Sequence, residues 1–226
     1  MFRRFAVSCG ICTLVFLFFS LNWASADAKK LTPDELEKAK ALYATYCSQC
    51  HGDKGRGDGP AAAFVYPKPR DFKRGLYKIR TTPSGKIPTD EDLFRVITEG
   101  MPGTSMNAWR RLSDEERWLL AYYIKTFSRR LSRARKSPEP ITIGEPIPMT
   151  SESIQRGEEI FNKMECGKCH GDEGRGDGPS APTLKDKWDF PIRPGNLKKS
   201  WNFRGGNRRE DIYKNIMVGI TGTPMP

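Results

Sequence analysis

A ten-residue segment occurs twice in this chain, and its repetition constrains the fold more than any other feature. His51–Pro60 reads HGDKGRGDGP, and His170–Pro179, 119 residues further on, differs from it at one position. Asp92–Arg95 and Gly103–Met106 also have counterparts at the same spacing. Matches at one constant spacing indicate a duplicated domain. We therefore expect a first domain at 27–127 and a second at 151–226.

The first 26 residues have the pattern of a secretory signal peptide. A basic start is followed by an apolar run over 5–21, and Ala24–Ala26 is a small-residue cleavage site. The run is short for a membrane span, which needs about 20 apolar residues, so a cleaved peptide is favoured over a retained anchor. The sequence thus predicts a periplasmic protein, in which Cys9 and Cys12 carry no chemistry.

The segment between the repeats, 128–150, is basic and rich in proline. It contains five Lys and Arg residues, two Glu residues and four prolines. Such a proline density disfavours helices and sheets and predicts a semi-rigid linker. The chain has a net charge of +11, but its basic residues do not form a long stretch interleaved with aromatic residues, which argues against nucleic-acid binding. We interpret the basic segment as a solvated linker, with docking to an acidic protein partner or a membrane surface as the alternative.

Each repeat carries the sequence Cys-x-x-Cys-His. It stands at Cys47, Cys50 and His51 in the first repeat, and 119 residues later in the second, at Cys166, Cys169 and His170. This is the attachment pattern of c-type haem, in which two cysteines form thioethers to one porphyrin and the histidine binds its iron. Two such motifs at the spacing of a whole-domain repeat predict two covalently bound haem c groups.

Two other chemistries use the same residue types. A thioredoxin-like redox pair needs a preceding strand and no obligatory histidine. A four-ligand zinc site would need the two motifs to converge, although each lies in its own repeat. We therefore favour haem over a redox disulfide or a zinc site.

The count of histidines limits the second axial ligand of each iron. The chain has only two histidines, and both are assigned as proximal ligands, so neither haem can have two. Methionine is the natural alternative. Met106 and Met225 correspond exactly at the repeat spacing of 119, whereas Met101 corresponds to an isoleucine and Met217 to a threonine. The repeat therefore selects Met106 and Met225 as axial ligands.

Capping signals and apolar spacing predict small helical domains. Thr32–Glu35 and Ser113–Glu116 are capping boxes that open helices ending near 47 and 127. A middle helix is expected from Asp90 to about Thr98. The second repeat should form helices at 152–165 and from Arg209 to about Met217. Weaker candidates for haem propionate contacts are Arg70, Arg80 and Trp109.

Together these motifs resemble the class I cytochrome c fold in its diheme, tandem-domain form. The resemblance rests on Cys-x-x-Cys-His-Gly, the following Gly-Asp-Gly-Pro, and the later Gly-Thr-x-Met of each repeat. It implies an all-α fold, thioethers at the four motif cysteines, and His/Met ligation. It also implies that the carbonyls of Pro60 and Pro179 accept hydrogen bonds from the proximal histidines.

The same resemblance implies a function in electron transfer. Related bacterial cytochromes serve membrane oxidases and periplasmic dehydrogenases, so we expect redox protein partners with acidic docking surfaces, including a membrane-associated respiratory complex. The alternatives are a diheme enzyme such as a peroxidase and an electron-entry module of a larger enzyme. The counterpart of the first domain's terminal helix would fall at about 232–246, so we expect the second domain to be truncated.

Overall fold

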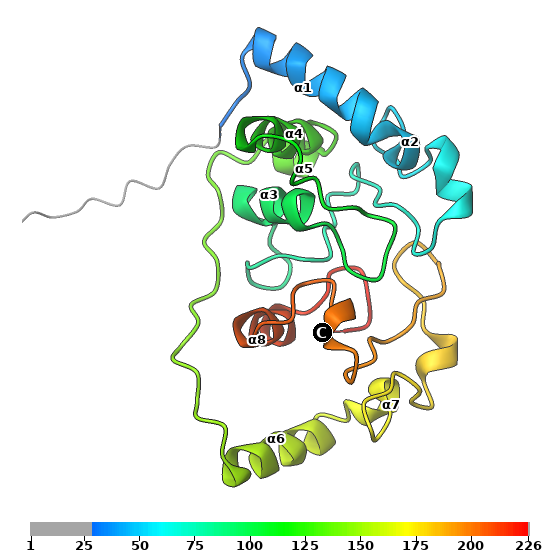
Figure 1. The fold of residues 1–226 in the computed structure, drawn as a ribbon, viewed down its shortest axis with the longest axis vertical. Helices are drawn as coiled ribbons and strands as arrows, with labels where there is room; N and C mark the ends of the chain where they lie inside the picture. Colours follow the sequence, from blue (N-terminus) through cyan, green and yellow to red (C-terminus); the bar gives the residue numbers. More distant parts are fainter. Residues whose placement is uncertain (1–28, 226) are drawn as a thin grey trace, which may run out of the picture.

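The computed structural model describes residues 29–225 and consists of helices and loops (Figure 1). Within that range it has no strand, although Lys185 and Pro191 form an isolated bridge, so the predicted all-α fold is confirmed. The elements are α1 (Pro33–Tyr46), α2 (Ser48–His51), η1 (Pro60–Phe64), α3 (Asp90–Glu99), α4 (Asp114–Thr126), α5 (Arg129–Ser132), α6 (Ser151–Lys163), α7 (Gly167–His170), η2 (Ala181–Thr183), η3 (Ser200–Asn202) and α8 (Arg209–Val218).

The predicted signal peptide, with Cys9 and Cys12, lies outside the described residues, as does Pro226. Within 29–225, no helix combines the length and the apolar character needed to cross a membrane.

The core of the first domain forms where α4 packs against α1 and α3. Tyr43 of α1, Leu93 of α3 and Leu120 of α4 belong to one buried cluster, and each is at most 2% exposed. Removing this apolar surface from water provides the main driving force for packing the three helices. Phe72 and Tyr77, from the loop between η1 and α3, complete the cluster and extend it toward the Cys-x-x-Cys-His segment.

Capping boxes fix where the helices of the first domain begin. The side chain of Thr32 accepts from the backbone N–H of Glu35 while the Glu35 side chain accepts from Thr32, and the same exchange occurs between Ser113 and Glu116. Both predicted boxes are therefore confirmed. A third joins Thr89 to Asp92 at the start of α3. Each box satisfies two backbone donors that a helix N-terminus otherwise leaves unpaired.

Helices α6, α7 and α8 of the second domain correspond to α1, α2 and α3 of the first, with one local difference before the haem motif. In the first domain the backbone N–H of Cys47 donates to Tyr43 at 2.9 Å, whereas that of Cys166 donates to Phe161, one residue further back, at 3.0 Å. The extra residue is accommodated by Glu165, which adopts a left-handed conformation with φ 55°. Helix α6 consequently ends at Lys163, and Phe161 takes the place of Tyr43.

The apolar residues of α6 and α8 are far more exposed than their counterparts in the first domain. No residue of α6 is buried. Ile216 of α8 is 60% exposed, whereas Ile97, its counterpart in α3, is 6% exposed within the cluster that includes α4. The position expected for a counterpart of α4, at 232–246, lies outside the described residues. The second domain therefore buries less apolar surface than the first.

The two domains are joined by direct contacts between α3 and α8, which lie close together in the middle of the molecule (Figure 1). Arg95 of α3 forms an ion pair with Asp211 of α8 at 3.3 Å, and Asp211 is only 4% exposed. Nearby, the guanidinium of Arg74 donates to the backbone carbonyl of Lys187 at 2.9 Å. These contacts fix the second domain against the loop side of the first.

Part of the segment 128–150 packs on the first domain. It begins with α5, which contacts α4 and buries Leu131 to 1% exposure. Further along, the backbone N–H of Ile141 donates to the carbonyl of Thr81 at 2.7 Å. The expected linker is thus attached to the first domain over much of its length, and the chain beyond Ile141 leads to α6 (Figure 1).

Asp92 connects α3 to the loop that precedes it, and we expect its loss to destabilise the first domain. Its carboxylate accepts hydrogen bonds from the backbone N–H of Thr81 at 2.8 Å and of Thr89 at 3.0 Å. In Asp92→Ala these donors lose their partner, which should lower the free energy of unfolding by about 2–4 kcal/mol. Denaturant titration of the haem-loaded protein measures this change. The exposed neighbour Glu91 provides the control, and equal losses in Asp92→Ala and Glu91→Ala would contradict the interpretation.

Candidate haem sites

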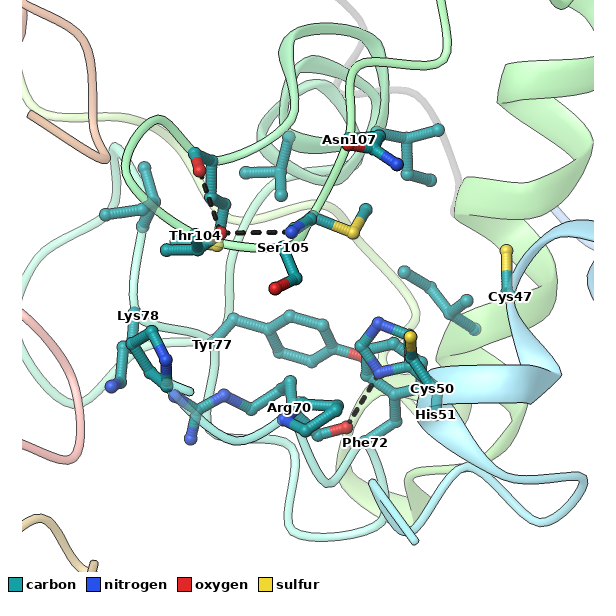
Figure 2. A pocket seen from close by; sticks show the side chains of 18 of the residues that line it. Cys47, Cys50, His51, Arg70, Phe72, Tyr77, Lys78, Thr104, Ser105 and Asn107 are labelled. Carbon is teal, nitrogen blue, oxygen red and sulfur yellow. Dashed lines mark hydrogen bonds between the residues drawn. The ribbon is translucent and has the colours of Figure 1, made fainter. Parts of the chain in front are cut away.

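A cavity in the first domain brings together the site residues that the sequence predicts there. Cys47, Cys50 and His51 line one side, and Met106 lies on the loop that lines another. Figure 2 shows the Cys-x-x-Cys-His side chains facing this space, with Thr104 and Ser105 of the methionine loop across it. The remaining walls are largely apolar and include Leu93, Ile97, Leu120 and Ile124.

The turn that carries the cysteines is held by its own backbone. The N–H of His51 donates to the carbonyl of Cys47 at 2.9 Å, which closes one helical turn and presents both cysteines and the histidine toward the cavity. Gly59 approaches this turn so closely that an added Cβ would lie 2.4 Å from the carbonyl oxygens of Ser48 and Gln49. The glycine-rich sequence after the motif therefore permits the loop to pack against α2.

The ring of His51 is held by a hydrogen bond at Nδ1 and by an aromatic ring stacked on it. Its Nδ1 lies 3.0 Å from the carbonyl oxygen of Arg70, and because a carbonyl only accepts, Nδ1 carries the proton and donates. Phe72 stacks on the ring with a centroid separation of 4.4 Å. Burial lowers the pKa of His51, which favours the neutral imidazole. Its Nε2 is then left with a lone pair for a metal.

The second domain holds its histidine in the same way. His170 Nδ1 lies 3.0 Å from the carbonyl oxygen of Gly195. The two carbonyls occupy equivalent positions, since the N–H of Phe72 donates to Gly55 and that of Leu197 donates to Gly174, at 2.7 and 2.6 Å. The residue at the position of Phe72 is Leu197, which has no aromatic ring to stack on the histidine.

The expectation that Pro60 and Pro179 supply these carbonyls is wrong. Pro60 instead begins η1, on the far side of the glycine-rich turn. The loop after η1 folds back beneath α2 and brings the residue that follows Pro69, or Pro194 in the second domain, under the histidine. The path of the backbone in this loop therefore determines which carbonyl accepts the hydrogen bond from the histidine.

The methionine loops of the two domains have the same hydrogen bonds. In the first, the N–H of Met101 donates to the carbonyl of Met106 at 2.9 Å, and the hydroxyl of Thr104 accepts from the N–H of Met106 at 3.1 Å. In the second, Ile220 donates to Met225 at 3.3 Å, and the Thr223 hydroxyl accepts from Met225 at 3.2 Å. Met106 and Met225 are therefore structurally equivalent, as their spacing predicts. Met101 also lines the cavity, whereas Met217 is 58% exposed.

The polar edge of the first cavity is basic. Arg70, Lys78 and Arg204 line it, and burial lowers the pKa of Arg70 to about 10 and that of Lys78 to about 8. The hydroxyl of Tyr77, which points toward the His51 side of the cavity (Figure 2), is buried and without a hydrogen-bond partner among residues 29–225. A haem carries two propionate carboxylates that complement such an edge. Its apolar porphyrin suits the remaining walls, so the residues present fit the group.

Of the weaker propionate candidates, only Arg70 lies on this basic edge, and its carbonyl also holds His51. Arg80 instead contacts the carbonyl of Val218 and the hydroxyl of Thr221 in the second domain. Trp109 lines the cavity and packs against Tyr46 with the two rings tilted, at a centroid separation of 5.2 Å. Lys78, Tyr77 and Arg204 were not singled out from the sequence.

The two competing chemistries find little support in this geometry. Burial raises the pKa of the Cys47 thiol to about 12, which disfavours the reactive thiolate that a redox disulfide pair needs. Throughout 29–225, no three His, Cys, Asp or Glu side chains gather closely enough to hold a metal ion. The four motif cysteines remain in two separate pairs, one in each domain.

Comparison with known proteins assigns both halves of the chain to cytochromes c. Residues 34–124 match the family described as cytochrome c oxidase, cbb3-type, subunit III, and residues 154–226 match the family described as cytochrome c. A chain of the Kuenenia stuttgartiensis reducing HAO-like protein complex is 42% identical, with a TM-score of 0.83, and the match covers 89% of each chain. The chain is a diheme c-type cytochrome. It therefore binds two haem c groups covalently.

Shorter matches relate this diheme cytochrome to two curated proteins. Thiosulfate dehydrogenase of Stutzerimonas stutzeri is 27% identical over 100 residues, which are 42% of this chain and 28% of that protein. Cytochrome c55X of Paracoccus denitrificans is 53% identical over 38 residues, which are 16% of this chain and 37% of that protein. The chain thus matches only about a third of the length of these curated relatives.

We expect the two haems of this cytochrome to be lost independently. His51 and His170 lie in separate domains, each held by a backbone carbonyl of its own domain. His51→Ala should therefore reduce the haem content from two to one per chain, and the matched variant His170→Ala should do the same. Pyridine haemochrome assay of the purified protein gives this ratio. Loss of both haems from either variant, with the full-length chain verified by mass spectrometry, would contradict independent sites.

Proposed function

We propose that this diheme cytochrome is a non-catalytic electron carrier of the periplasm. It passes single electrons between a dehydrogenase or quinol-linked donor and an oxidase or reductase. The observation that carries the proposal is the equivalent histidine and methionine loop in both domains, because a His/Met pair saturates the iron and gives substrates no open coordination site. The predicted signal peptide supports the periplasmic location.

In this proposal each domain contributes one complete set of ligands. The thioethers form at Cys47 and Cys50 in the first domain and at their counterparts Cys166 and Cys169 in the second. The proximal ligands are His51 and His170, through Nε2, and the distal ligands are Met106 and Met225. The bound haem c supplies a one-electron couple between ferric and ferrous iron, whose potential methionine ligation raises.

The surroundings of the proposed ligands limit how far they can move. His51 is held by the Arg70 carbonyl and by Phe72, and Met106 by the hydrogen bonds of its loop. A ligand set held in one geometry needs little rearrangement when the iron changes charge, which suits outer-sphere transfer. The apolar walls around it exclude water.

A protein partner for this electron transfer is supported by two observations. The structural relative from Kuenenia stuttgartiensis belongs to a protein complex, and the likeness extends over both domains. The basic residues of the segment 128–150 are exposed: Arg129, Arg130, Arg133, Arg135 and Lys136. We propose that they steer an acidic surface of the partner toward this chain, an attraction that weakens as salt rises.

The relationship to thiosulfate dehydrogenase suggests which reaction to test for the alternative function, a diheme enzyme. That match covers 28% of the curated protein, and the alternative would need an iron open to substrate in one domain. The matching hydrogen bonds of the two methionine loops speak for two closed sites. Visible spectroscopy and turnover assays separate the two functions.

We expect the methionine–iron charge-transfer band of the oxidised protein to arise equally from the two domains. Met106→Ala and Met225→Ala should each halve the band and lower the potential of one haem, because the iron loses a soft thioether ligand. Met101→Ala is the matched control for Met106, since both side chains line the same cavity. Met217→Ala is the control for Met225. Both controls should leave band and potentials nearly unchanged.

Two results would contradict this assignment. If Met101→Ala abolishes the first-domain band while Met106→Ala spares it, the equivalence of the two methionine loops does not identify the ligand. A high-spin band in the unmodified protein, with turnover of peroxide or thiosulfate, would instead favour the enzyme.

A further inference from the structure

The second domain sends one side chain into the haem cavity of the first. Arg204 follows η3, at the interface between the domains, and lines the same cavity as His51 and Met106. Trp188, also from the second domain, lies against this edge, with the guanidinium of Arg70 4.1 Å from its ring centroid. The first haem cavity is thus completed by residues of both domains.

The first domain also sends an arginine into the second, but this arginine is bound by protein groups. Arg80 of the first domain is 2% exposed and reaches into the second, where it donates to the carbonyl of Val218 and the hydroxyl of Thr221. These partners are neutral protein groups that occupy both terminal nitrogens of its guanidinium, although its Nε has no partner among residues 29–225. Arg204 makes no corresponding hydrogen bond to a protein group among residues 29–225. The two arginines therefore perform different tasks at the interface.

The charges around Arg204 are unbalanced. Arg70, Lys78 and Arg204 lie close enough for their positive charges to repel one another. Burial lowers the pKa of all three groups. Asp186 lies 4.0 Å from the Lys78 ammonium, and Asp186 and Asp71 act electrostatically on Arg70, but among residues 29–225 neither Arg70 nor Arg204 forms a carboxylate ion pair. Partly buried cations are costly without anionic partners. The hydroxyl of Tyr77, on the His51 side of the same cavity, is also without a hydrogen-bond partner among residues 29–225 (Figure 2).

We propose that Arg204 binds a propionate of the first haem across the domain interface, together with Arg70 and Lys78 of the first domain. The inference rests on haem binding in this cavity, but not on the identity of the sixth ligand. A positive charge beside the haem disfavours the ferric state, which carries one more positive charge than the ferrous state. Docking of the second domain therefore raises the potential of the first haem, and Arg204 couples the two domains.

The test compares variants that remove one positive charge from the second domain. Arg204→Gln should lower the potential of the first haem by about 59 mV, equivalent to a tenfold change in its reduction equilibrium, and leave the second haem nearly unchanged. Arg156→Gln removes the same charge from an exposed position on α6 and should change neither. Arg204→Lys keeps the charge and should restore most of the potential.

Spectroelectrochemical titration of the full-length, haem-loaded chain measures both potentials. Proteins with one haem, made by His51→Ala or His170→Ala, assign each potential to its domain without relying on methionine ligation. Unchanged potentials in Arg204→Gln, a shift confined to the second haem, or equal shifts in Arg204→Gln and Arg204→Lys would overturn the proposal. In that case an intact methionine–iron band would still support the carrier function.

Lys78→Gln provides a second variant if Arg204→Gln does not accumulate. Lys78 reaches the same edge from the first domain, so its replacement should also lower the potential of the first haem alone. If the potential of the first haem does not change in Lys78→Gln, the basic edge does not bind the propionates and the proposal fails.

Discussion

Both haem sites depend on a hydrogen bond between a histidine ring and a backbone carbonyl. His51 meets the carbonyl of Arg70, and His170 meets that of Gly195, each at 3.0 Å. The contact orients the ring, places the proton on Nδ1 and leaves Nε2 for iron. It also joins the Cys-x-x-Cys-His turn to the loop beneath it. In the first domain that loop contributes Phe72 and Tyr77 to the core and Lys78 to the basic edge, so ligand geometry and folding are linked.

The two haem sites share their local geometry but differ in the residues that surround them. Around the first site, Phe72 stacks on the histidine, and the helices α1, α3 and α4 share one buried cluster. Around the second, Leu197 occupies the corresponding position and is 41% exposed, and α6 has no buried residue. The surroundings of an iron tune its potential through burial and charge. Two haems with the same proposed ligands can therefore differ in potential.

The sequence predicted those features that depend on residue type and constant spacing. The repeat located both haem motifs and related Met106 to Met225, whose loops have the same hydrogen bonds. The capping boxes at Thr32 and Ser113 predicted where α1 and α4 begin, because their physics is local. The count of only two histidines, both in haem motifs, also excluded a second histidine ligand at either iron.

Features that depend on the route of the backbone could not be predicted in this way. A carbonyl acceptor has no side-chain signature, so Pro60 was chosen in place of Arg70. The spacing between equivalent residues also changes from 119 at Gly55 to 125 at Phe72, which conceals the correspondence of this loop. Arg204 was missed because a repeat relates a domain to its copy and says nothing about how the two copies meet.

The central claim, that each domain holds its iron between one histidine and one methionine, is tested most directly by proton nuclear magnetic resonance of the fully reduced protein. A methionine bound to ferrous haem lies against the porphyrin, whose ring current moves its resonances far upfield. Our account predicts two such sets of signals, assigned to Met106 and Met225. A single set, no set, or assignment of either set to Met101 or Met217 would contradict it.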